Sequence, residues 1–138
     1  MKVLDPMEIY YRGLRDLTFL QSAERLLFML QDFDNLMEME GWEHFFRYQH
    51  HFIWYAEMKE WLHTIGENFS LAVLQDYESY LKVNGVELSP EAIANSDAMG
   101  EAHSLACNDL CNRYCELRSV RWAKAMVHLE NQGIRIQM

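Results

Sequence analysis

Apolar residues recur at helical spacing along most of this chain, and that spacing is the strongest constraint on its fold. Leu26, Leu30, Phe33 and Met37 stand at positions i, i+4, i+7 and i+11. Residues at that spacing line one face of a single helix. The pattern therefore predicts a long amphipathic helix near the start of the chain, with similar but shorter segments after it.

Start and stop signals divide the pattern into separate helices. Segment 5–8 (Asp-Pro-Met-Glu) offers an N-cap acid, a proline at the first helical position and a glutamate at N3. The first expected helix begins at Asp5, and the second extends from about Ser22 to Gly41. A third begins at Trp42, and a fourth follows His50-His51 as far as Gly66. The fifth extends from the cap Asn68 to Asn84-Gly85, and the last two occupy Leu105–Leu117 and Val120–Leu129. Residues 92–100 are small and polar, which favours a loop or a frayed turn.

Length and composition predict one domain with one core. A chain of 138 residues is close to the commonest size of a single domain, and half of its residues are hydrophobic. Strand-like alternation is confined to segments 86–88 and 134–136, each too short to build a sheet alone. We therefore expect an all-α fold, a compact bundle of about six or seven helices, with residues 1–138 as a single helical domain.

The chain carries no sequence signal for export or for membrane insertion. Segment 1–6 lacks the apolar core of a secretory signal, and no later run approaches the roughly 18 to 20 apolar residues of a bilayer crossing. The three cysteines fall within nine positions, an odd number that favours reduced thiols over a disulfide framework. These features predict a cytoplasmic protein that does not contact a membrane.

The net charge of −9 is concentrated in the middle of the chain. Residues 24–101 hold fifteen acids and four lysines or arginines, whereas residues 1–23 are neutral and residues 102–138 are weakly basic. An acidic field repels nucleic acid, because affinity for phosphate backbones comes largely from lysine and arginine. A basic protein surface is the partner that this charge favours, with no direct contact to nucleic acid.

Acidic residues lead directly into a dense block of aromatic residues. Between Gln31 and Phe46 there are five carboxylates and no lysine or arginine, and eight aromatics lie between Trp42 and Trp61. An anionic face beside a rigid apolar core suits a protein-binding module, although acidic surfaces also serve solubility alone. The candidate partner-binding residues are Asp32, Asp34, Glu38, Glu40, Glu43, Glu57 and Glu60.

Soft metal ligands recur at every fourth position on one predicted helix. These are His103, Cys107, Cys111 and Cys115, and an i, i+4 pair of such ligands can hold zinc. The outer two would lie about 18 Å apart along the axis, so one ion cannot use all four. Free cysteine packs as a small hydrophobic residue, so we expect a core role for this stripe, and no metal site or cofactor.

A possible catalytic pair lies near the end of the chain. Arg121 and His128 have six residues between them on a predicted helix, and this spacing resembles the active-site signature of the all-helical HEPN ribonucleases. An arginine can hold a scissile phosphate while a histidine moves protons. The residue after Arg121 is Trp122, where that family favours a polar side chain. A ribonuclease that uses Arg121 and His128 is therefore the enzymatic alternative.

The order of motifs also resembles an all-helical family of otherwise unknown function whose best-known member is a bacterial DNA-mimic protein. The similarity covers about residues 22–129 and rests on segments 38–46 (Glu-Met-Glu-Gly-Trp-Glu-His-Phe-Phe), 62–66 (Leu-His-Thr-Ile-Gly) and 109–117. The chain departs from the family pattern at the turn, where Glu40 precedes a single glycine and Trp42 replaces phenylalanine. The resemblance implies an acidic helical module that occupies the DNA-binding surface of another protein.

Together these features predict a non-enzymatic, acidic protein-binding module. Its expected partner is the basic surface of a DNA-binding protein or of a toxin, so DNA mimicry and an immunity or antitoxin role are the two nearest variants. The aromatic excess leaves a homodimer possible. We expect no catalytic residues outside the alternative pair Arg121 and His128.

Overall fold

A computed structural model describes residues 2–137, with the backbone alone for Trp42. Its elements are β1 (Lys2–Leu4), α1 (Pro6–Arg15), η1 (Leu17–Phe19), α2 (Ser22–Met39), α3 (Trp42–Arg47), α4 (Gln49–Phe52), α5 (Tyr55–Thr64), α6 (Asn68–Val83), α7 (Pro90–Asn95), η2 (Ser96–Met99), α8 (Glu101–Glu116), α9 (Arg118–Asn131) and β2 (Ile134–Ile136). The prediction of a compact all-α fold is confirmed, although helices α1 to α9 exceed the expected six or seven.

Capping residues account for most helix boundaries. The Asp5 carboxylate accepts hydrogen bonds from the amides of Met7 and Glu8, as the sequence predicts for the start of α1. Gly41 and Gly85 adopt positive φ angles of 79° and 74° after α2 and α6, a conformation that glycine takes at little cost.

Three local predictions are wrong. The cap of α6 is Glu67 and not Asn68, since the Glu67 carboxylate accepts from two amides of the first turn. Residues 92–100 are mostly helical, in α7 and η2, because the side chain of Ser89 caps α7. The helix expected from Leu105 begins at Glu101.

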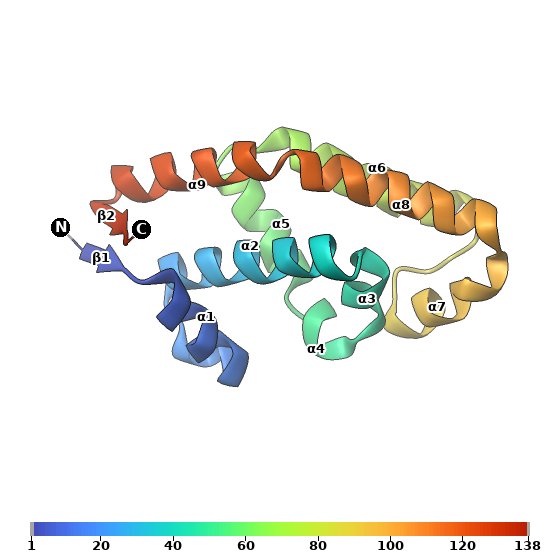
Figure 1. Cartoon of the computed structure of the whole chain (residues 1–138), viewed down its shortest axis with the longest axis horizontal. Helices are drawn as coiled ribbons and strands as arrows, with labels where there is room; N and C mark the ends of the chain where they lie inside the picture. The colour runs from blue at the N-terminus through green and yellow to red at the C-terminus, as the bar shows by residue number, and fades with distance from the viewer. Residues whose placement is uncertain (1, 138) are drawn as a thin grey trace.

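Helix α2 lies through the middle of the molecule and contacts α1, α3, α5, α8 and α9 (Figure 1). Its face carries Phe33 into an aromatic core, where the Phe33 ring centroid lies 4.6 Å from that of Phe45 and 5.1 Å from that of Tyr114. Phe46 and Tyr55 continue the cluster at 4.8 Å. Edge-to-face geometry of this kind adds to the stabilisation from apolar burial.

Helix α1 packs closely on α2 because Gly13 has no side chain. A Cβ atom at Gly13 would stand 2.3 Å from the Phe28 ring, which no side chain could tolerate without movement. The two helices can therefore approach each other only where glycine occupies this position.

The first and last described segments form a two-stranded parallel sheet. Strand β1 pairs with β2 with Val3 opposite Arg135, and Leu4 and Ile136 are both buried. Figure 1 shows this sheet at one end of the molecule and α7 at the other. Segment 134–136 is thus a strand as its alternation suggests, whereas segment 86–88 is not. The pairing with residues 2–4 had no sequence signal.

Among the helices of residues 2–137, none combines the length and the apolar character that a bilayer crossing requires.

Candidate functional site

Asp34, one of the candidate partner-binding residues, lies in a buried ion pair. Its carboxylate is 2.8 Å from the Arg121 guanidinium, and each side chain is about 1% exposed. The indole N–H of Trp122 donates to the second carboxylate oxygen at 3.0 Å. Burial raises the pKa of the Asp34 carboxyl, and the Arg121 guanidinium opposes that rise. Asp34 therefore holds α2 to α9 and is not part of the surface expected from the sequence.

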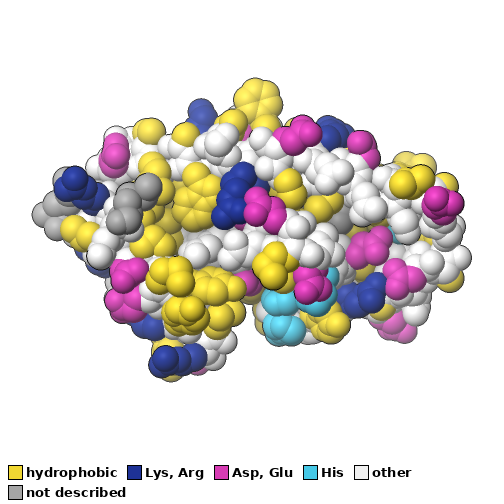
Figure 2. Space-filling model, viewed as in Figure 1, with side chains coloured by type: hydrophobic (Ala, Val, Ile, Leu, Met, Phe, Trp, Pro, Cys, Tyr) yellow, Lys and Arg dark blue, Asp and Glu magenta, His cyan; other side chains and the backbone are white. Residues whose placement is uncertain are grey.

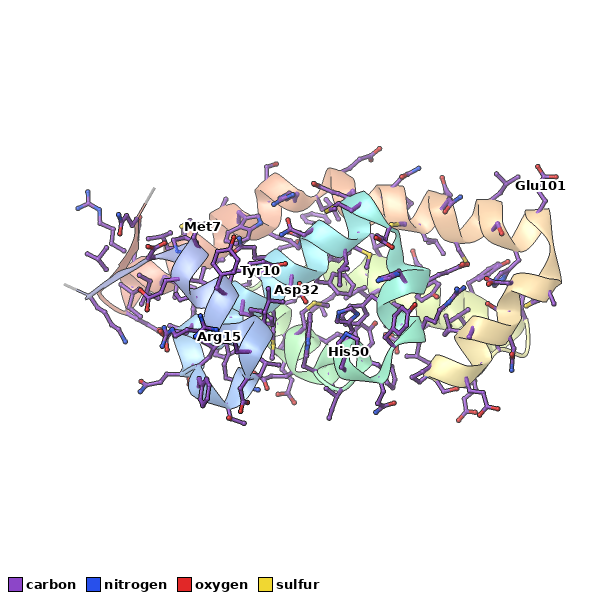
Figure 3. All side chains as sticks on the ribbon, turned by 60° about the horizontal axis from the view of Figure 1, so that its bottom comes forward. Met7, Tyr10, Arg15, Asp32, His50 and Glu101 are labelled. Carbon is purple, nitrogen blue, oxygen red and sulfur yellow. The ribbon has the colours of Figure 1, made fainter. Side chains whose placement is uncertain are left out.

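Asp32 is also buried, at 5% exposure. The Tyr10 hydroxyl donates to its carboxylate at 3.3 Å, and Figure 3 shows the two side chains approaching each other between α1 and α2. Burial is the largest cause of a raised pKa for the Asp32 carboxyl, and the Tyr10 hydrogen bond opposes it. The expectation of a surface role is wrong for Asp32 as it is for Asp34.

Two further acids of the predicted set are occupied by arginines. Arg25 donates to both carboxylate oxygens of Glu57, at 2.6 and 2.8 Å, in the bidentate geometry of a strong ion pair. Arg118 lies 2.7 Å from Glu38. The hydrogen bond from Arg25 lowers the pKa of the Glu57 carboxyl, as an adjacent positive charge does. Glu60 is exposed and lies one turn after Glu57 on α5, away from Glu40 and Glu43 on the chain.

The remaining two, Glu40 and Glu43, belong to an acidic end of the molecule. The end of α2 and helix α3 form one part of this acidic end. The other part extends from the segment that follows α6, through α7 and η2, to the first turn of α8. Its carboxylates are Glu40, Glu43, Glu87, Glu91, Asp97 and Glu101. Figure 2 shows acidic side chains outnumbering basic ones towards the right-hand end, and Figure 3 labels Glu101 at its tip.

Basic side chains at the acidic end are few. Arg47 is paired with Asp97 at 2.7 Å, and His44 contacts Glu40 at 3.0 Å. The four acids of the 83–101 segment were not singled out in the sequence, because they are spread over nineteen residues that show no acidic run. The fold collects them by packing α7 on α3.

A mixed cluster of ligand atoms lies where α3 meets α8. Glu43, His103 and Cys107 each direct one donor atom to a common region, and these atoms lie within 4.8 Å of one another. The Cys107 Sγ is 3.7 Å from His103 Nε2, which is 4.0 Å from a Glu43 carboxylate oxygen. Burial raises the pKa of the Cys107 thiol to about 12, with Glu43 as a further cause. The sequence indicated the histidine and the cysteine, but nothing in its spacing indicated Glu43.

The other two cysteines take the packing role that the sequence predicts. Cys111 is buried, and its thiol lies 3.6 Å from the backbone oxygen of Met37. Cys115 is partly buried near the end of α8. Neither belongs to the cluster at Glu43.

The alternative catalytic pair is not assembled for phosphate chemistry. The Arg121 guanidinium is occupied by Asp34, by the Ser70 hydroxyl at 3.0 Å and by the Tyr114 backbone oxygen at 2.6 Å. At 1% exposure it cannot reach a scissile phosphate in this conformation. His128 lies at the surface of α9, next to Gln132.

Comparisons with protein-family models, with curated proteins and with solved structures gave no match.

Proposed function

We propose that this chain is a non-catalytic protein-binding module whose acidic end docks on a basic protein surface. The observation that carries the proposal is the meeting of two base-free segments. Residues 26–46 and residues 83–112 each contain five acids and no lysine or arginine, and the packing of α3 against α7 brings the last part of the first segment, with Glu40 and Glu43, together with residues 87–101 at one end of the molecule. Elsewhere acids and arginines are interleaved, as in the pairs Arg25–Glu57 and Arg113–Asp76.

Three of the six acids at this end are suited to contact a partner because they have no lysine or arginine partner. Glu87, Glu91 and Glu101 are exposed, and no ion pair with a lysine or arginine within residues 2–137 involves them. An unpaired surface carboxylate remains free to pair with a partner's cation, which steers association and fixes register.

A DNA-binding protein is the partner class that we favour. The DNA-binding surface of such a protein is basic, and the exposed carboxylates Glu87, Glu91 and Glu101 complement it in charge. A toxin with a basic active site would offer the same complementary surface.

The proposal can be tested by replacing Glu87, Glu91 and Glu101 with glutamine. The heparin-binding fraction of a lysate from the source cells, which contains the DNA-binding proteins, is passed over the immobilised chain at low salt. We expect the native chain to retain a basic protein and duplex DNA to displace it. Exposed ion pairs contribute about 0.2 to 1 kcal/mol each, so the triple variant should bind about three- to hundredfold more weakly.

A matched control changes the same charge elsewhere. Glu8, Glu116 and Glu130 are exposed and lie away from the acidic end, and their replacement by glutamine also removes three negative charges. Equal retention by the two triple variants would show that net charge alone attracts the partner and would refute a defined surface. Failure of duplex DNA to compete would exclude DNA mimicry and favour the toxin-inhibitor variant.

A further inference from the structure

We propose that Glu43, His103 and Cys107 form a zinc-binding site between α3 and α8. The site shares Glu43 with the acidic end but differs from the docking surface in its chemistry, and either proposal can fail without the other. It departs from the expectation of a metal-free chain, which was based on the spacing of residues along α8 alone.

The geometry is close to that of a metal centre. Zinc binds sulfur at about 2.3 Å and histidine nitrogen or carboxylate oxygen at about 2.0 to 2.2 Å, so its ligand atoms stand about 3.4 to 3.6 Å apart in a tetrahedron. The observed separations are 3.7 Å from Cys107 to His103, 4.0 Å from His103 to Glu43, and at most 4.8 Å for the remaining pair. The separations must therefore shorten by about 1.4 Å at most.

The two helical ligands are rigid and the third can adjust. His103 and Cys107 are 4% and 2% exposed on α8, at the i, i+4 spacing that places two ligands side by side. The Glu43 side chain is 27% exposed, so it can close on an ion from the solvent side. A site of this kind has three protein ligands and leaves the fourth tetrahedral position to a water molecule on the side of Glu43.

Tyr80 contacts His103 on the side of the ring opposite to Cys107, at Nδ1. Its hydroxyl lies 3.3 Å from His103 Nδ1, and the two rings stack with centroids 5.6 Å apart. When Nε2 binds a metal, Nδ1 carries the proton and its N–H donates a hydrogen bond to the Tyr80 oxygen. Such outer contacts fix the tautomer and the ring orientation of metal-binding histidines.

The chemistry of the three donor atoms favours zinc over magnesium and calcium. A thiolate, an imidazole and one carboxylate suit zinc, whereas magnesium and calcium require oxygen ligands. The Cys107 thiol must lose its proton to solvent as the Zn–S bond forms. Each Zn²⁺ bound with loss of one proton adds one positive charge to this part of the molecule.

The test is metal binding by the purified, untagged chain. Apo protein is titrated with Zn²⁺ against a chromophoric chelator, and with Co²⁺, whose thiolate charge-transfer band reports a metal–sulfur bond. We expect one equivalent of metal and a charge-transfer band in the native chain. Cys107→Ser should remove the band and weaken zinc binding by more than about 100-fold, since loss of outer contacts alone costs 10- to 100-fold. Tyr80→Phe should weaken it by about tenfold.

Control substitutions outside the cluster separate the site from the rest of the protein. Cys115→Ser and His63→Gln remove a cysteine and a histidine outside the cluster and should leave the affinity unchanged. Glu43→Gln, on a partly exposed side chain, should lower the affinity without disturbing the circular dichroism of the fold. Absence of binding, or equal affinity in Cys107→Ser and Cys115→Ser, would overturn the proposal.

Discussion

Asp32 and Asp34 stand two residues apart on α2, and each is buried among different neighbours. Positions i and i+2 point to different sides of a helix, so the sequence placed both acids outside the apolar stripe and predicted them to be exposed. Exposure would follow if α2 lay on the surface. Instead α2 is covered by α1, α5, α8 and α9, and a helix that is enclosed on several sides must bury its polar residues also. Tyr10 and Arg121 provide the hydrogen bonds that make this possible.

The raised pKa of Asp32 predicts a pH-dependent gain from its replacement by asparagine. A carboxyl whose pKa is higher in the folded state stabilises the fold at low pH and loses that contribution as pH rises through the folded-state pKa. Asparagine keeps the shape and an acceptor for Tyr10 without a charge. In urea unfolding, Asp32→Asn should match the native chain below about pH 3.9 and become progressively more stable above it.

Asp16 offers the opposite control for that experiment. Hydrogen bonds from the Thr18 hydroxyl and amide lower the pKa of this exposed carboxyl. Its contribution is present at neutral pH and lost in acid, so Asp16→Asn should be less stable than the native chain at pH 7, with a difference that shrinks on acidification. The same trend for Asp32→Asn and Asp16→Asn would contradict the burial argument.

Helix boundaries were the most predictable part of the fold, because a cap is made within a few residues. Asp5 and the glycines after α2 and α6 act where the sequence suggests. Two starts are exceptions: α8 begins at Glu101 and not at Leu105, and α6 is capped by Glu67 although Asn68 is the better capping residue by preference. Glu67 is fully buried, so packing of the preceding turn, which no local pattern reveals, decides which side chain faces the amides.

Removal of the Glu67 cap should destabilise the protein. Its carboxylate accepts from the amides of Phe69 and Ser70, both at 3.0 Å. Loss of a capping side chain costs about 0.5 to 2 kcal/mol, and we expect Glu67→Ala to fall near the upper value because the freed amides are partly buried. Asn68→Ala should change the free energy of unfolding by less than about 0.5 kcal/mol. Urea denaturation of both variants decides the question, and a larger cost at Asn68 would reverse the assignment.

At the scale of the whole molecule, the contacts that define the candidate sites join residues far apart in sequence. Asp34 meets Arg121, Arg25 meets Glu57, and Glu43 meets His103. Composition and spacing identified the acids and the soft ligands as separate sets, but a one-dimensional pattern does not reveal which members meet. For this reason the sequence predicted the acidic character of the molecule, and the fold was needed to locate it at the end formed by α3, α7 and α8.

The sheet between the two ends of the described chain makes a testable contribution to overall stability. Leu4 and Ile136 are paired in register and buried at 5% and 8% exposure. Each replacement by alanine should cost about 2 to 5 kcal/mol. Because the side chains share one face, the double variant should depart from additivity by about 0.5 kcal/mol or more, whereas Leu4→Ala with Ile93→Ala, on the distant α7, should be additive. Additivity in both double variants would show that the strands do not pack as a unit.

A tryptophan lies beside each of the ion pairs Arg121–Asp34 and Arg25–Glu57. Trp122 donates its indole N–H to Asp34, and Trp61 donates to Glu57 at 3.2 Å, so each of these chromophores is hydrogen-bonded to a carboxylate that also holds an arginine. The energy of an excited indole depends on the charges beside it. Trp122 and Trp61 are therefore intrinsic fluorescent probes of the contacts that join α2 to α9 and α2 to α5, and loss of either contact would shift the emission wavelength of the tryptophan beside it.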